Sequence, residues 1–421
     1  MAKLKGVPRP EKPVRVKHLL KVEGDANNNK YYDMYDTGDG KFIAFYGRVG
    51  ADPQIEEYPI SKWDSKYKEK LSARKGYKDI THLRVETSSG QSFVDIADVS
   101  VANFVAELQR YANNLIQQTY LVTARTVTLA QIAEAQRVLD QLLMFINDPG
   151  YSKLVEDKYL TEVNDVLIKL FTVIPRKMKN VKDHLIHQKD ETILRQIITD
   201  EQDNLDTMEG QVKAFQLQQQ NTANNVTLLD AMGLQISTVD NGIIPHIRNL
   251  LGENAKQFHR AFRIVNVKTQ ERFDKHLATC KNKTVMELWH GSRNQNWWSI
   301  MGSGLVLHPT SAVITGKMFG YGLYFADKAR KSIGYTSLSG SYWARGGDSK
   351  AFLALFDVHV GNQWHVRRHS YEMNTLTWDK LRQKGDFDSL FAEGGYDLYN
   401  NEFIVYREPQ ATIKYLVEIG H

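Results

Sequence analysis

The sequence predicts a multidomain α+β protein in which a helical block lies between two β-rich blocks. The chain has 421 residues, more than one hydrophobic core usually organises, so two or three domains are expected. Eight glycines lie in residues 1–100, three in 101–240 and seventeen in 241–421. Glycine disfavours helix interiors and is common in turns. The glycine-poor middle is therefore expected to be helical, and both ends rich in strands.

Composition and charge limit the classes of protein to which this chain can belong. A content of 42% hydrophobic and 10% aromatic residues is typical of folded globular protein. The N-terminus has no apolar signal-peptide core, and no apolar run approaches the ~18–20 residues that span a bilayer. We therefore expect an intracellular protein with no membrane partner. Residues 1–21 carry seven Lys or Arg and one Glu. This basic arm, residues 1–22, suits contact with nucleic-acid phosphates, and a solvated tail explains it equally well.

The first block carries a hairpin signal and a basic helix. Residues 30–50 are two alternating, aromatic-rich runs around "DTGDG", a pattern typical of a β-hairpin. Lys62, Lys66, Lys70 and Arg74 recur every four residues. That spacing places them on one face of a helix predicted within residues 61–80. Residues 81–90 are predicted to close the block as a strand.

The middle block shows helical periodicity. Apolar stripes follow residues 104–115 and 129–146, and a third helical pattern over 160–175 ends at Pro175. Thr128 and Gln131 form a candidate capping box, and "NDPG" at 147–150 ends the second helix. Residues 213–227 are polar and predict a loop or a frayed helix end.

From residue 241 the pattern changes to short β-rich runs between Gly, Asn and Ser turns, including 261–273, 285–290 and 351–360. The last of these runs, "TIKYLVEI", is residues 412–419. No helical stretch of 10–15 residues is expected to alternate regularly with these strands, so a doubly wound parallel sheet is disfavoured. We predict a mixed or antiparallel sheet with a ligand cleft.

Several familiar motifs are absent. "TGKM" at 315–318 lacks the Ser or Thr of a phosphate loop, and "GYG" at 320–322 runs into a strand instead of opening a helix. His365 and His369 have no glutamate between them, as a metalloprotease helix needs. Cys280 is the single cysteine, which excludes a disulfide framework and a zinc module built on several cysteines. No metal site is expected.

The order of short motifs supplies a stronger signal. "LWHGSRNQNWWSIMGSGLVLHP" (288–309), "TGKMFGYGLYFADKARKSIGY" (315–335) and "YNNEFIVY" (399–406) together resemble the catalytic domain of poly(ADP-ribose) polymerases. Residues 128–143 and 163–175 resemble that family's helical regulatory domain. Residues 31–50 with "KGYKD" (75–79) resemble its WGR module, although Tyr46 stands where the module's Trp is expected. The resemblance implies a basic arm (1–22), a WGR-like DNA-binding domain (23–100), a helical autoinhibitory domain (101–240) and an ADP-ribosyltransferase domain of mixed or antiparallel β structure (241–421).

The resemblance implies NAD as substrate, with no metal, and names the catalytic residues. Breaking the bond between nicotinamide and ribose builds positive charge on the ribose, which a nearby carboxylate stabilises. Glu402 matches the family's catalytic glutamate. His290 matches the histidine that positions the adenosine ribose, and Tyr324 completes this set. Lys331 matches a lysine near the reacting ribose.

The resemblance also implies further NAD contacts. The Gly291 backbone and the Ser332 hydroxyl match groups that bind the nicotinamide amide, and Tyr335 matches the aromatic residue that stacks on its ring. The remaining expected contacts are Ser292, Asn296 and Lys317. Three positions depart from the family pattern: Val306 replaces an arginine, Lys317 a tyrosine and Asn400 an aromatic residue. These departures bear on NAD binding and polymer length.

The predicted function is DNA-break-stimulated transfer of ADP-ribose, as a polymer, from NAD to protein acceptors including the enzyme itself. Two alternatives remain open: a weakly active or inactive sensor of DNA ends, and a mono-ADP-ribosyltransferase. A monomer is expected, in the nucleus of a eukaryote and otherwise in the cytoplasm or nucleoid. Deleting residues 101–240 is expected to give activity without DNA. The residues expected at a DNA end or nick are Arg48, Tyr46, Lys62, Lys66, Lys70, Arg74 and Tyr77.

Overall fold

The computed structural model describes residues 2–4, 6–24, 28–49, 51–83, 92–222, 225–308 and 318–421. The chain forms two compact units, one of Met1–Ser88 with Ile116–Glu201 and the other of Ser89–Leu115 with Gln202–His421. The division falls inside two long helices, α2 (Val99–Thr119) and α7 (Glu191–Gln220). The predicted mixture of α and β structure in several sheets is confirmed, and the four-part domain division stays a prediction.

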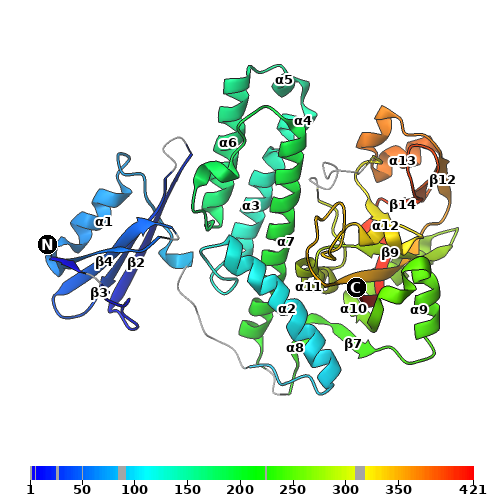
Figure 1. The fold of residues 1–421 in the computed structure, drawn as a ribbon, viewed down its shortest axis with the longest axis horizontal. Helices are drawn as coiled ribbons and strands as arrows, with labels where there is room; N and C mark the ends of the chain where they lie inside the picture. The colour runs from blue at the N-terminus through cyan, green and yellow to red at the C-terminus, as the bar shows by residue number, and fades with distance from the viewer. Residues whose placement is uncertain are drawn as a thin grey trace. The chain divides into compact units, whose positions relative to one another are not determined.

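The first unit contains a six-stranded antiparallel sheet in the order β1-β5-β4-β3-β2-β6, of which Figure 1 labels β2, β3 and β4. The predicted hairpin is confirmed as β3 and β4, whose connecting turn has Gly38 and Gly40 at φ of 82° and 83°, which glycine adopts without strain. Part of the predicted basic arm is β2, inside this sheet. The strands are β1 (Ala2–Leu4), β2 (Arg15–Glu23), β3 (Asn28–Asp36), β4 (Lys41–Arg48), β5 (Gln54–Pro59) and β6 (Lys78–Asp79).

The basic helix is shorter than the predicted segment. It is α1 (Trp63–Leu71), and buried Trp63 packs with Phe42 and Tyr58 of the sheet. The prediction of a strand over 81–90 is wrong at its start, because Thr81–Leu83 form a 3-10 turn. There the Asp79 carboxylate accepts a hydrogen bond from the Thr81 backbone N–H at 2.8 Å, a geometry that favours a turn. Residues 84–90 lie outside the described part of the chain.

Asp79 links β6 to β2 and α1. Its Oδ2 accepts from Lys17 Nζ at 2.9 Å and from the Tyr67 hydroxyl at 2.6 Å. Burial raises the pKa of the Asp79 carboxyl, but hydrogen bonds from Lys17, Thr81 and Tyr67 outweigh it, so the net pKa lies well below the usual value. The ionised carboxylate therefore stabilises the fold above the unfolded pKa of about 3.9, and this contribution is lost as pH falls below it.

Replacing Asp79 by Asn is accordingly expected to lower the free energy of unfolding of the first unit by about 1–3 kcal/mol at pH 7. The difference from wild type should narrow as pH falls below about 4, where Asp79 of the unfolded chain becomes protonated, and should vanish only below the lower pKa of the folded carboxyl. Urea titrations at pH 7 and at acidic pH measure both values. Asp64, an exposed carboxylate on α1, provides the matched control as Asp64→Asn. If Asp79→Asn lowers the free energy of unfolding equally at both pH values, the result contradicts an electrostatic origin of the stabilisation by Asp79.

The other helices of the first unit follow the predicted stripes. The Thr128 capping box is confirmed, since Gln131 N–H donates to its hydroxyl and the Gln131 side chain accepts from its backbone. "NDPG" ends one helix as predicted, and Asp148 then caps another. Figure 1 shows α3 and α6 side by side. These helices are α3 (Leu129–Gln141), α4 (Met144–Asn147), α5 (Pro149–Ser152) and α6 (Glu156–Val173).

The second unit has two sheets. The five-stranded sheet, in the order β7-β8-β15-β11-β9, is antiparallel throughout, while the four-stranded sheet, β10-β14-β13-β12, has a parallel β12–β13 pair. The predicted mixed or antiparallel arrangement is thus confirmed. The strands are β7 (Leu234–Thr238), β8 (Phe258–Asn266), β9 (Val285–Gly291), β10 (Leu323–Phe325), β11 (Lys350–His359), β12 (Gln363–Val366), β13 (Ser389–Ala392), β14 (Glu402–Val405) and β15 (Ala411–Gly420).

The interpretation of residues 261–273 as one β run is wrong. The strand ends at Asn266, whose side chain accepts hydrogen bonds from the N–H groups of Lys268 and Thr269 and caps a 13-residue helix. Most of the polar residues that follow Asn266 lie on the exposed face of this helix. The helices of this unit, besides parts of α2 and α7, are α8 (Leu228–Met232), α9 (Ile244–Leu251), α10 (Val267–Thr279), α11 (Trp297–Ser303), α12 (Ala329–Ile333) and α13 (Trp378–Lys384).

The first turns of α2 belong to the core of the second unit. The Phe104 ring stacks on Phe262 of β8 with centroids 4.0 Å apart, and meets Phe352 of β11 edge-on at 5.7 Å. All three rings are buried. α7 reaches Gln220, beyond the start of the loop or frayed end predicted at 213. None of the described helices is both long and apolar enough to cross a membrane.

Candidate active site

His290 lies where the two sheets of the second unit meet. An isolated bridge joins Trp289 of β9 to Ala326, just after β10, through N–H···O bonds of 2.8 and 3.0 Å. The next residue, His290, is 2.9 Å from the Tyr324 carbonyl through its Nδ1. Because a carbonyl only accepts, Nδ1 carries the proton and Nε2 is the acceptor nitrogen of the ring. The backbone thus fixes both the tautomer and the orientation of His290.

Consecutive residues of the short helix α12 reach the two sheets. The buried Ser332 hydroxyl donates to the Trp289 carbonyl at 3.1 Å, which ties α12 to the strand that carries His290. The neighbouring Lys331 pairs through Nζ with Glu402 at the start of β14. Helix α12 therefore holds the His290 strand and the Glu402 strand in one arrangement.

Gly291 is required by this packing. A Cβ built on Gly291 would lie 1.9 Å from the Ser332 carbonyl oxygen, and backbone atoms cannot yield there. The close approach that excludes a side chain is thus that of α12. The expected contact of the Gly291 backbone with the nicotinamide amide stays a prediction.

Glu402 is a buried carboxylate beside a cation. It is 3% exposed, and β14 places it opposite Ala392 of β13. A carboxylate held in such a site, next to a lysine, can meet developing positive charge without waiting for water to reorganise. The arrangement suits stabilisation of an oxocarbenium-like transition state.

Three tyrosines are within reach of the charge of this carboxylate. The Tyr324 hydroxyl accepts from Phe319 N–H at 2.9 Å and donates to the Gly320 carbonyl at 3.1 Å. Tyr406, which sequence reasoning missed, donates to the Phe319 carbonyl at 2.7 Å. Burial raises the pKa of Tyr324, Tyr335 and Tyr406, and the charge of Glu402 adds to the effect. All three are therefore neutral phenols at physiological pH.

Tyr335 has an aromatic partner. Its ring is parallel to Trp343 within 15°, with centroids 6.1 Å apart. Trp343 was not singled out from the sequence, because a tryptophan in a Gly-Ser-rich stretch gives no signal without its spatial neighbour. The two rings offer flat apolar surfaces of the kind on which a nicotinamide ring stacks.

Asn296 contacts both Ser292 and helix α7. Asn296 Nδ2 donates to the Ser292 hydroxyl at 3.0 Å, and the Thr207 hydroxyl of α7 donates to Asn296 Oδ1 at 3.2 Å. Two further polar contacts link α7 to neighbouring residues of the second unit: Asp206 Oδ1 with His308 Nε2 at 3.2 Å, and Asp203 Oδ2 with Arg293 Nε at 3.9 Å. Part of α7 is thus attached to the segment that contains the expected NAD contacts.

The positions that depart from the family pattern differ in surroundings. Lys317 lies outside the described residues. Val306 is 38% exposed, so an apolar side chain stands at the surface where the family places a cation. Asn400 Oδ1 accepts from Arg330 Nε at 3.3 Å and Nη2 at 3.1 Å. Arg330 was missed, since nothing in the sequence links it to a residue seventy positions away.

The expected DNA-binding residues of the first unit fall into two groups. Lys70 Nζ lies 4.0 Å from the Tyr32 ring centroid, 5.5 Å from that of Tyr77 and 5.9 Å from that of Tyr46. Burial lowers the pKa of Lys70, and burial is also the main cause that raises the pKa of Tyr46 to about 12. Lys70, Tyr46 and Tyr77 thus form a packed cation–aromatic cluster with Tyr32.

The second group is more exposed. Lys62 and Arg74 are exposed, whereas Lys66 pairs with Glu69 at 3.0 Å. Arg48 Nη1 is 3.5 Å from the Lys179 carbonyl of the same unit. Lys62 and Arg74 are therefore the members of the predicted stripe that are most accessible to a phosphate backbone.

The fold and this site define an ADP-ribosyltransferase. A buried carboxylate beside a lysine lies on β14, and a backbone-oriented histidine lies on β9. These strands belong to two small sheets and flank β10, and both are tied to α12. The Poly(ADP-ribose) polymerase catalytic domain model matches residues 246–420, which include each of these groups.

Relatives agree with the match. Putative poly [ADP-ribose] polymerase-like 100L of Invertebrate iridescent virus 6 is 30% identical over 180 residues, 41% of this chain and 92% of that protein. Uncharacterized protein 101L of the same virus is 35% identical over 200 residues, 48% of this chain and 79% of that protein. Poly [ADP-ribose] polymerase 2 of Zea mays is 34% identical over 172 residues, 36% of this chain and 25% of that protein. The chain belongs to the poly(ADP-ribose) polymerase family and is an ADP-ribosyltransferase that uses NAD.

Proposed function

We propose that this enzyme is stimulated by DNA breaks, releases nicotinamide from NAD and builds ADP-ribose polymer on proteins, including itself. The observation that carries the chemistry is α12, where Ser332 is bonded to the His290 strand and Lys331 is paired with Glu402. In this proposal the enzyme acts on DNA as a monomer, in the nucleus of a eukaryote or at the nucleoid of another organism.

Each residue has a separate task in this proposal. His290, fixed by the Tyr324 carbonyl, hydrogen-bonds the adenosine ribose and holds the donor in place. Gly291 and Ser332 bind the nicotinamide amide, and Tyr335 stacks on its ring. Glu402 accepts a hydrogen bond from the nicotinamide ribose and stabilises the charge that develops there. Lys331 orients Glu402 and lies beside the acceptor.

DNA contact in this proposal involves the exposed basic residues of the first unit. Phosphate neutralisation is sequence-independent and salt-dependent, with a slope of about −0.9 per contact in log K against log salt. The packed Lys70 cluster instead fixes α1 on the sheet. Loss of Lys70 should therefore destabilise the unit, whereas loss of Lys62 or Arg74 should weaken DNA binding alone.

The double change Lys62→Ala with Arg74→Ala is expected to reduce the salt slope of nicked-DNA binding by about 2 and leave the fold intact. Fluorescence anisotropy at several salt concentrations gives the slope. Lys62 and Arg74 lie just outside the two ends of α1, and Lys68→Ala removes an exposed charge from α1 itself, outside the predicted stripe. This variant serves as the matched control. If the double variant and Lys68→Ala reduce the salt slope of DNA binding equally, the result contradicts a specific role for the predicted basic face.

Regulation is proposed to act through α7. The helix contacts the NAD-site segment through Thr207, Asp206 and Asp203. Its Gly210 lies so close to α11 that a Cβ there would be 2.8 Å from Ser299 Cβ. DNA binding would shift the population toward a state in which these contacts loosen and NAD enters.

Gly210→Val should therefore mimic DNA. The side chain forces α7 away from α11, and we expect activity without DNA to rise about 5–30-fold, corresponding to a coupling of about 1–2 kcal/mol. Initial rates of nicotinamide release with and without nicked DNA measure this. Lys213→Ala alters a more exposed position on the same helix and should change neither rate. Unchanged DNA dependence in a folded Gly210→Val protein contradicts the restraint.

The function itself is tested with labelled NAD and the purified 421-residue chain, with and without nicked or blunt DNA. The proposal predicts protein-bound label that increases with DNA and migrates as a ladder of lengths after denaturing electrophoresis. A single discrete addition would support a mono-ADP-ribosyltransferase. DNA binding without any transfer would support the sensor.

A further inference from the structure

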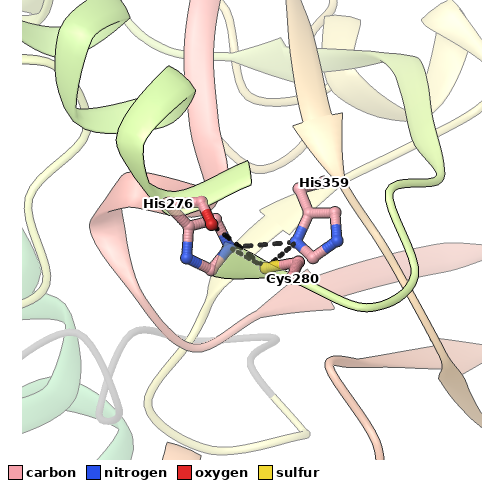
Figure 2. A group of neighbouring side chains, drawn as sticks. All are labelled: His276, Cys280 and His359. Atoms are coloured by element: carbon pink, nitrogen blue, oxygen red, sulfur yellow. Dashed lines mark hydrogen bonds between the residues drawn. The ribbon is translucent and has the colours of Figure 1, made fainter. Parts of the chain in front are cut away.

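Two imidazoles and a thiol converge in the second unit on residues that the NAD site does not use. His276 belongs to α10, Cys280 follows the end of that helix, and His359 is the last residue of β11. Their ligand atoms lie within 4.8 Å of one another, the one such group of at least three His, Cys, Asp or Glu in the described ranges. Figure 2 shows both rings and the sulfur directed toward a common point.

The separations are close to those of a tetrahedral metal site. His276 Nε2 is 2.9 Å from His359 Nδ1, and Cys280 Sγ is 3.6 Å from the first nitrogen and 3.9 Å from the second. Zinc bonds of about 2.0–2.1 Å to nitrogen and about 2.3 Å to sulfur imply about 3.3 Å between two nitrogens and about 3.6 Å between nitrogen and sulfur. Shifts of a few tenths of an ångström would therefore accommodate the ion.

The second imidazole is already oriented as a ligand. His359 Nε2 is 2.7 Å from the Asn282 carbonyl, which accepts the Nε2 proton and leaves the lone pair on Nδ1, toward His276. Metal-binding histidines commonly donate their other ring N–H to such an outer acceptor, which fixes tautomer and orientation. Two histidines that only filled the core would need neither this fixed ring orientation nor a cysteine beside them.

The protonation states also permit binding. Burial, and then the neighbouring His359, lower the pKa of His276 to about 4, so the ring is neutral at pH 7. Burial raises the pKa of the Cys280 thiol, so the proton must leave when metal binds. Of the charged side chains whose fields reach the thiol, Asp388 attracts a cation, whereas Arg407 and Lys283 oppose it.

We propose that His276, Cys280 and His359 bind one Zn²⁺, with water as the fourth ligand. A thiolate with two imidazoles suits zinc better than magnesium or calcium, which prefer oxygen ligands. On binding, the Cys280 thiol loses its proton, and the proton shared between the imidazoles moves to His276 Nδ1. Each Zn²⁺ therefore releases one proton to solvent.

The site would stabilise the framework of the catalytic unit. It joins the end of α10 to the end of β11, and β11 pairs along its length with β9, which carries His290. Because the ion binds the folded form, a zinc concentration about 100-fold above the dissociation constant should raise the melting temperature by about 5 °C or more.

The test uses the full-length protein, reduced and freed of metal, titrated with Co²⁺ as a spectroscopic probe. We expect one Co²⁺ per chain, visible bands of a tetrahedral ion, a near-ultraviolet thiolate-to-cobalt band, and displacement of cobalt by Zn²⁺ with release of about one proton. No bound cobalt when Co²⁺ is in excess, or binding without the thiolate band, overturns the proposal.

Variants then locate the ion. Cys280→Ser should lose the thiolate band, and both it and His359→Asn should weaken binding by more than the roughly 10–100-fold that loss of an outer-shell partner costs. His365→Ala, at the exposed His365–Glu393 pair, should bind as wild type does. Unchanged cobalt spectra in Cys280→Ser refute the assignment, even if that variant unfolds at a lower temperature.

Discussion

Replacing Glu402 by Gln is expected to lower nicotinamide release by about 10²–10³-fold, as loss of one preorganised transition-state contact does elsewhere. The glutamine side chain keeps the size of the glutamate but has no charge to offer the developing oxocarbenium. Lys331 would also lose its ionic partner. Because the remaining donor contacts stay in place, the loss should fall on kcat more than on KM.

Glu393→Gln provides the matched control. Glu393 follows β13 of the same sheet but is partly exposed, with 32% of its side chain accessible, and it pairs with His365 and Arg367. Its substitution should leave nicotinamide release unchanged. Equal rates for wild type and Glu402→Gln, in proteins with the same melting temperature, contradict the assignment of Glu402.

The second large effect concerns stability. Phe104→Ala is expected to reduce the free energy of unfolding of the second unit by about 3–5 kcal/mol. The ring is completely buried and stacks on Phe262 at 4.0 Å, so its loss removes apolar burial and leaves a cavity. Guanidinium denaturation monitored by intrinsic fluorescence gives the change.

Val99→Ala is the control for Phe104→Ala, because Val99 lies on the same helix but is 70% exposed. If Phe104→Ala lowers the free energy of unfolding no more than Val99→Ala does, the result contradicts the place of α2 in the core. The same packing bears on the deletion of residues 101–240, which removes Phe104, Val105 and Leu108 from this cluster. We still expect activity without DNA from that protein, with a lower melting temperature than the full chain.

Sequence patterns predicted the structure correctly where residues a few positions apart in the chain determine it. The "DTGDG" hairpin and the Thr128 capping box follow from turn and cap chemistry within a few residues, and both are confirmed. The helix after Asn266 was missed because its apolar positions continue a β-rich run. The cap that ends the strand depends on an asparagine side chain, a weaker signal than Gly or Pro.

The candidate site was predictable only in part. His290, Ser332 and Glu402 are recognisable through the order of three motifs, which no periodicity supplies. The roles of Trp343, Tyr406 and Arg330 depend on contacts between distant segments, such as the Arg330–Asn400 pair. The reason for Gly291 was likewise inaccessible, because it requires knowing that the Ser332 backbone approaches it.

The expectation of no metal site stays a prediction, and sequence spacing could not have suggested the zinc site proposed above. A single cysteine argued against zinc, since the familiar modules combine several. His276 and Cys280 are four residues apart, but the third ligand, His359, is 79 residues from Cys280. Only the pairing of β11 in the sheet brings it to the end of α10, and sequence spacing alone gives no sign of this.

The most direct test of the central claim compares nicotinamide released with ADP-ribose bound to protein, in parallel reactions with nicked duplex and without DNA. We expect both quantities to rise with the duplex and to remain equal, because each NAD cleaved delivers one ADP-ribose to an acceptor. No release under either condition, or release without protein-bound ADP-ribose, would contradict it.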